Sequence, residues 1–117
     1  MTDIYIDPIA AATPDAVDQL RHLTGTGHRV MVLGELPATL ADEPSMTAAD
    51  SLPIKPPPGS WLLTADPERC ADRRPPMQTM LVGPMPAPSP RPAPRCDTQA
   101  RDLAAAVLEV LGREAMG

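Results

Sequence analysis

The chain has 117 residues, of which 43% are hydrophobic, so its length and composition suit one globular domain spanning residues 1–117 rather than a disordered segment. Its net charge of −5 excludes nucleic acid and anionic membranes as partners bound through the overall field. No apolar run has the length of a membrane span and residues 1–12 do not resemble a secretory signal, so we expect a cytoplasmic protein that contacts no membrane.

Strand-like and helix-like segments alternate along the chain. Four short segments combine β-branched and other apolar residues, as strands do, and residues 52–54 suggest a fifth. The four are residues 3–7, 28–34, 60–65 and 78–83. Apolar residues recur at helical spacing in residues 14–26 and 98–113. This alternation predicts a three-layer, Rossmann-like α/β fold with a parallel sheet of four to five strands.

The helix starts and the apolar face of the second helix are also predicted. Thr13-Pro14-Asp15 has the residue types that begin a helix, and Asp97 or Thr98 is expected to cap the second one. The second helix is expected to bury Ala100, Leu103, Ala104, Val107, Leu108 and Leu111. Between the last strand and this helix, residues 84–95 have proline at every second position. That spacing favours an extended, rigid strap and lacks the three-residue period that SH3-type recognition needs.

Charged side chains follow several predicted strands where the strands end. Asp7 follows the first strand, Lys55 follows the suggested strand at 52–54, and Asp66 follows the strand at 60–65. Because the carboxyl ends of parallel strands share one edge, where α/β folds bind ligands, these residues are candidates for one site. Each also has a structural interpretation, since Asp-Pro pairs begin turns and Lys55 lies among prolines.

The order of these residues resembles the haloacid dehalogenase (HAD) superfamily over nearly the whole chain, as a small member without a cap domain. The resemblance implies that Asp7 is the counterpart of the nucleophile and that Lys55, in Ile-Lys-Pro, is the counterpart of the family lysine. It makes Asp66 the first acidic residue of the last motif. With Asp66 and the backbone carbonyl of Ile9, Asp7 would then hold a Mg²⁺ ion.

The chain departs from that pattern at the positions that carry the chemistry. Ile9 stands where the acid/base aspartate belongs, Gly34 replaces a serine or threonine, and Cys70 replaces the second acidic residue of the last motif. Phosphoryl transfer needs a proton donor for the leaving group, and Ile9 is not one. Asp7 and Lys55 are therefore vestigial catalytic candidates, as in a pseudoenzyme.

Three functions agree with the sequence. The first is a non-catalytic, HAD-like binding or assembly module. The second is a weak or divergent Mg²⁺-dependent phosphohydrolase, and the third is an unrelated small Rossmann-like ligand-binding domain, although no glycine-rich phosphate loop occurs. The partners that these functions imply are a second copy of the chain, forming a homodimer, and a small phosphorylated ligand.

Cys70 and Cys96 allow two interpretations. Without a secretory signal, two reduced thiols are favoured. The alternative is a disulfide, because Cys70 follows a strand and Cys96 precedes the final helix, both near the carboxyl edge of the predicted sheet.

Overall fold

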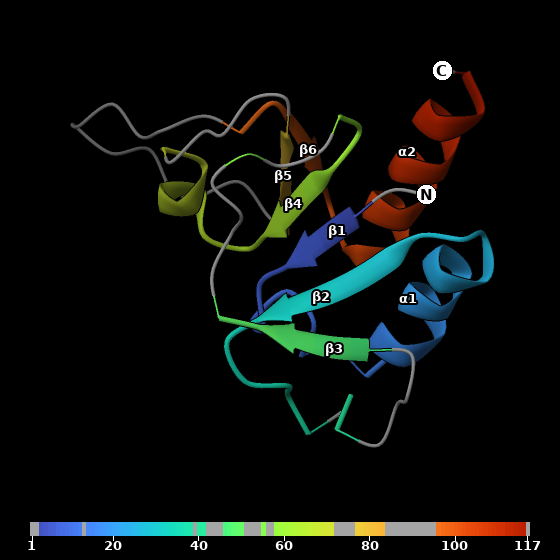
Figure 1. Cartoon of the computed structure of the whole chain (residues 1–117). Coiled ribbons are helices and arrows are strands. Elements are labelled where there is room, and N and C mark those ends of the chain that lie inside the picture. Colours follow the sequence, from blue (N-terminus) through green and yellow to red (C-terminus); the bar gives the residue numbers. More distant parts are fainter. Residues whose placement is uncertain are drawn as a thin grey trace.

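In the part of the chain that it describes, the computed structural model contains a six-stranded, all-parallel β-sheet and two α-helices (Figure 1). The described residues are 3–12, 14–38, 40–41, 46–50, 55, 58–71, 77–83 and 96–116. The strands are β1 (Asp3–Ile6), β2 (Arg29–Leu33), β3 (Met46–Ala49), β4 (Trp61–Thr64), β5 (Gln78–Val82) and β6 (Thr98–Ala100). The helices are α1 (Ala16–Gly25), the short 3₁₀-helix η1 (Pro67–Ala71) and α2 (Leu103–Met116).

The strands lie in the order β3-β2-β1-β4-β5-β6, and each neighbouring pair is parallel. This is the order of doubly wound α/β folds, so the predicted fold class is confirmed at that level. From β1 the chain winds outward through β2 to β3, then crosses back to β4 on the other side of β1. The carboxyl ends of β1 and β4 therefore form the topological switch point, where such folds bind ligands.

The predicted strand number was wrong, because six strands are described where four to five were expected. The additional strands, β3 and β6, are the two edges of this sheet. Their sequences, Met-Thr-Ala-Ala and Thr-Gln-Ala, have little β propensity, so pairing with β2 and β5 decides their conformation. The suggested strand at 52–54 and the strap at 84–95 lie outside the described residues. The N-cap of α1 is Asp15, two residues later than the predicted cap at Thr13.

The final helix begins five residues later than predicted. Asp102 caps α2, because its Oδ1 accepts a hydrogen bond of 2.8 Å from the Ala105 amide, and residues 98–100 belong to β6. The buried face of α2 is Leu103, Ala106, Val107 and Val110. Leu108, which was predicted to be buried, is 70% exposed. None of the described helices is long and apolar enough to cross a membrane.

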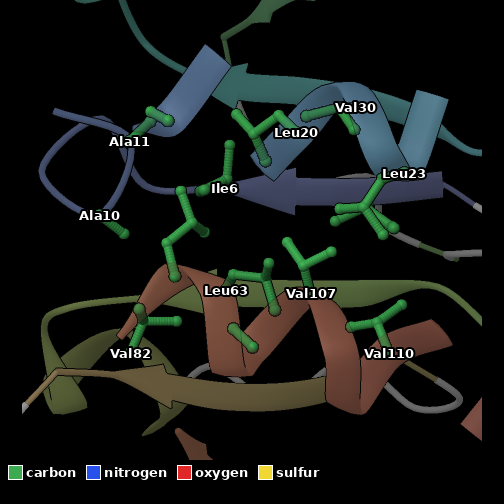
Figure 2. Packing of buried hydrophobic residues seen from close by; sticks show 14 of the residues in the cluster. Ile6, Ala10, Ala11, Leu20, Leu23, Val30, Leu63, Val82, Val107 and Val110 are labelled. Atoms are coloured by element: carbon green, nitrogen blue, oxygen red, sulfur yellow. The ribbon is translucent and has the colours of Figure 1, made fainter. Parts of the chain in front are cut away.

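Both α-helices pack on the same face of the sheet. In Figure 2, Leu20 and Leu23 of α1 and Val107 and Val110 of α2 point toward the side chains of the central strands, including Ile6 and Leu63. A second cluster lies on the other face. It contains the strand residues Tyr5, Leu33 and Leu62, together with Met77, which directly precedes β5. No described α-helix contributes to that second cluster, so the described helices form one layer where three-layer folds have two.

Tyr5, the chain's only tyrosine, lies in the second cluster and is 7% exposed. Burial raises the pKa of its phenol, and the nearby Asp3 carboxylate raises it further. The folded state therefore holds this proton more tightly than the unfolded state, whose tyrosine pKa is about 10. This contribution to stability is complete below about pH 10 and is lost as the pH rises through the folded-state pKa.

We expect the free energy of unfolding to fall more steeply above about pH 10 in the wild type than in Tyr5→Phe. Tyrosinate absorbance gives the folded-state pKa directly, because no other tyrosine contributes, and denaturant unfolding over the same pH range gives the stability. The prediction fails if tyrosinate appears at the pKa of free tyrosine, or if Tyr5→Phe loses as much alkaline stability as the wild type.

Candidate functional site

Asp7 lies at the switch point, directly after β1. Its amide donates a hydrogen bond of 2.9 Å to the Leu63 carbonyl, which continues the β1–β4 pairing, and its side chain is only 1% exposed. Oδ1 accepts a 2.9 Å hydrogen bond from the Ile9 amide, the pattern by which aspartate begins a turn. The carboxylate is thus fixed against the backbone of its own loop.

Thr64, the last residue of β4, joins Asp7 to the segment that follows β4. Its buried hydroxyl donates to Asp7 Oδ2 over 2.9 Å and accepts from the Asp66 amide over 3.0 Å. Asp66 itself is exposed and begins η1, because its Oδ1 accepts from the Glu68 amide and its carbonyl accepts from the Arg69 amide. Thr64 therefore couples the carboxyl ends of the two central strands.

Arg69 supplies the positive charge that faces Asp7. Its Nε lies 3.1 Å from Asp7 Oδ2, and the two side chains are 45% and 1% exposed. Both carboxylate oxygens of Asp7 consequently have partners from the protein itself, namely the Ile9 amide, the Thr64 hydroxyl and the Arg69 guanidinium. A buried carboxylate needs such partners to remain charged.

The structure brings together part of the predicted residue set. Asp7 and the Asp66 backbone meet through Thr64, whereas Lys55 is exposed and forms no described ion pair with Asp7 or Asp66. Ile9 is 69% exposed, and its carbonyl accepts a 3.3 Å hydrogen bond from the Ala12 amide. Only the backbone of Ile9 therefore takes part in the interactions around Asp7.

These residues fit the predicted Mg²⁺ ion poorly. Within the described residues, no three His, Cys, Asp or Glu side chains are placed to hold a metal. A divalent cation on Asp7 Oδ2 would have to displace Arg69, and the Ile9 carbonyl is already an acceptor within its turn. We therefore derive no chemical step through a metal at this site.

Gly34 follows β2 at the same edge, at the position where the HAD pattern has serine or threonine. Its φ is +84°, a left-handed conformation that strains any residue with a Cβ atom, although the space around it is open. Its amide donates a hydrogen bond of 2.8 Å to the Ala49 carbonyl of β3. The backbone turn after β2 thus explains the glycine, and it disfavours a hydroxyl-bearing side chain there.

Cys70 and Cys96 form a disulfide, with their α-carbons 5.1 Å apart, so the favoured prediction of two reduced thiols was wrong. The bond joins η1 to the residue that precedes β6 by two positions. Cys70 is fully buried. The two cysteines therefore give no indication of a reducing compartment.

Sequence reasoning missed Thr64 and Arg69 as parts of this edge, and it missed Asp97 as a partner of β5 at the opposite, amino-terminal end of the sheet. The available signals were a hydroxyl residue closing a buried strand and a basic residue within one turn of Asp66. Asp97 was expected to cap a helix, whereas its Oδ2 accepts hydrogen bonds from the amide and hydroxyl of Thr79 in β5.

No protein-family model, curated protein or solved structure matches the chain. The resemblance to the HAD superfamily therefore rests on the order and spacing of Asp7, Lys55 and Asp66 along the sequence. Function has to be argued from the site itself.

Proposed function

We propose that the chain is a non-catalytic binding or assembly module with a HAD-like fold, in which Asp7 acts as a structural anchor. The observation that carries this proposal is the engagement of both Asp7 carboxylate oxygens by Ile9, Thr64 and Arg69. A nucleophilic carboxylate has to approach its substrate with a lone pair available. An oxygen held by a buried hydroxyl and a guanidinium lacks that freedom.

The residue at position 9 supports the same proposal. Ile9 stands at the sequence position of the family's general acid, and its side chain cannot donate a proton. General acid catalysis is worth about 10²- to 10⁴-fold in rate. Its loss, combined with an occupied carboxylate, leaves little catalytic power for phosphate esters.

The alternative is a divergent Mg²⁺-dependent phosphohydrolase, and the position of Asp7 at the switch point favours it. For that activity Arg69 would have to leave Asp7, and its 45% exposure gives the side chain room to move into solvent. The two functions therefore differ in whether the Asp7–Arg69 pair opens for a ligand.

A titration with Mg²⁺ and beryllofluoride, which imitates a phosphoryl group on a carboxylate, separates the two functions. We expect no saturable binding by calorimetry and no turnover of phosphomonoesters by the wild type. The Arg69→Ala variant removes the guanidinium that faces Asp7 Oδ2. Its matched control is Arg101→Ala, because the Arg101 side chain is 89% exposed and does not contact Asp7. Wild-type turnover that disappears in Asp7→Asn would replace this proposal with the phosphohydrolase.

The partner proposed for the module is a second copy of the chain or a small phosphorylated ligand. A second copy would pair with β3 or β6, which are the edge strands of the described sheet. A separate calorimetric titration with phosphomonoesters tests the ligand, and light scattering over a range of protein concentrations tests the homodimer.

A further inference from the structure

The two cysteines of the disulfide are each adjacent to a residue that is anchored to the sheet. On one side, Cys70 follows Arg69, whose guanidinium binds Asp7 at the end of β1. The Arg69 amide also donates a hydrogen bond of 3.1 Å to the Asp66 carbonyl, and Cys70 itself is fully buried. Side-chain and backbone interactions therefore hold Cys70 in place independently of its bond to Cys96.

A second network holds the other cysteine. Cys96 precedes Asp97, whose Oδ2 accepts 2.9 Å and 3.1 Å hydrogen bonds from the amide and hydroxyl of Thr79. The Thr79 hydroxyl in turn lies 2.9 Å from the Asp97 amide, and Thr79 is almost completely buried within β5. Position 97 is thus fixed to the sheet by three short contacts that do not involve sulfur.

We propose that Asp7 and Asp97 are positioning residues for a reversible Cys70–Cys96 disulfide. Their networks keep the two α-carbons near the observed 5.1 Å after reduction, within the range that a disulfide spans. Each reduced thiol then meets the other at a high effective concentration, because the ordering has already taken place. The bond closes again readily and persists against thiol reductants of moderate strength.

Thiol exchange enters this disulfide at Cys96. The Cys70 sulfur belongs to a fully buried residue, whereas Cys96 is half-buried. A thiolate of a dithiol reductant attacks the Cys96 sulfur and breaks the S–S bond, and Cys70 leaves as a thiolate. The second thiol of the reductant then attacks the mixed disulfide and releases Cys96. Two electrons pass from the dithiol, which ends as a disulfide, and both cysteines end as thiols after protonation.

The test is the thiol–disulfide equilibrium of the whole chain in glutathione buffers of graded ratio. The fraction of disulfide is read by alkylation and mass spectrometry, and circular dichroism identifies the conditions under which both forms remain folded. We expect Arg69→Gln and Asp97→Ala each to weaken disulfide formation by about fivefold, because each frees one cysteine-bearing segment. Arg69→Lys is expected to recover part of this loss, since it keeps the charge beside Asp7.

The matched control is Asp3→Asn, which removes the exposed Asp3–Arg29 ion pair at the opposite end of β1. It is expected to leave the equilibrium unchanged. Equilibria for Arg69→Gln and Asp97→Ala within about twofold of the wild type while both forms are folded would overturn the positioning role. If Asp97→Ala does not fold when reduced, Thr79→Val provides the same measurement by removing the hydroxyl. Trapping the first glutathione adduct on Cys70 rather than Cys96 would overturn the assigned entry point.

Discussion

Replacing Asp7 with alanine is expected to lower the free energy of unfolding by about 3 kcal/mol, because three donors lose their acceptor at once. The Thr64 hydroxyl is buried, so it would be left without the partner that Asp7 Oδ2 provides. The Ile9 amide loses the hydrogen bond that shapes the turn after β1. Arg69 contributes less, since water reaches its half-exposed guanidinium. Urea unfolding followed by circular dichroism measures this loss.

Two further variants are compared with Asp7→Ala in the same unfolding experiment. Asp7→Asn keeps the shape and one acceptor oxygen, so a loss of about 1 kcal/mol is expected. Asp66→Ala removes an exposed carboxylate that accepts a hydrogen bond from the Glu68 amide, and it should cost about 1 kcal/mol or less. An Asp7→Ala chain that is as stable as the wild type, or more stable, would point instead to a carboxylate kept for catalysis at the expense of stability.

The Cys70→Ala/Cys96→Ala chain is expected to lose about 3 kcal/mol of unfolding free energy in the chain-entropy description of disulfides. The bond joins residues 26 positions apart, so removing it frees a long loop in the unfolded state. Thermal and urea unfolding measure the loss, and alanine is chosen because buried Cys70 behaves as a small apolar residue.

The reduced wild type is the matched control for this variant, since it lacks the covalent bond but keeps both sulfur atoms. Its stability should fall near that of the alanine variant when a strong dithiol is present. A loss below about 1 kcal/mol in both would mean that the unfolded chain gains little freedom when the bond is removed.

The central strands and the first helix were predictable because the pattern of apolar residues in their sequences matches the burial of those residues in the structure. Val30 and Val32 face one cluster of the core and Leu33 the other, so the apolar run in β2 reflects contacts on both faces of the sheet, although the described α-helices cover only one of them. The position of Asp7 followed from the same reasoning, since a residue after a central parallel strand lies at the carboxyl edge.

The edge strands and the final helix boundary were not predictable from local patterns. Ala100 fits the apolar spacing of the following helix, yet it pairs with Val82 of β5 and fills the core as part of a strand. Periodicity cannot separate these alternatives, because the same residue satisfies both. Tertiary pairing with β5 and the cap at Asp102 decide between them.

The partners of Asp7 also depend on long-range structure. The sequence offers Lys55 and Arg69 as cations near the carboxyl edge, and spacing alone does not choose between them. The choice follows from η1, which begins at the Asp66 turn and places Arg69 beside Asp7. The direction in which that turn carries the chain is not encoded in a local pattern.

The exclusively parallel pairing of the described strands also bears on the order in which the chain folds. Parallel neighbours cannot be joined by a tight hairpin, so each strand pair brings together segments that are well separated along the chain. Such long-range topology slows folding, because the chain loses the entropy of loop closure before the stabilising contacts between strands can form. Of the two pairs that β1 makes, β1–β2 closes the shorter loop, and we expect it to form before β1–β4. The backbone groups on the other side of β1 then stay unpaired until β4 adds to the sheet. One of these groups is the Asp7 amide, which binds the Leu63 carbonyl in the folded protein.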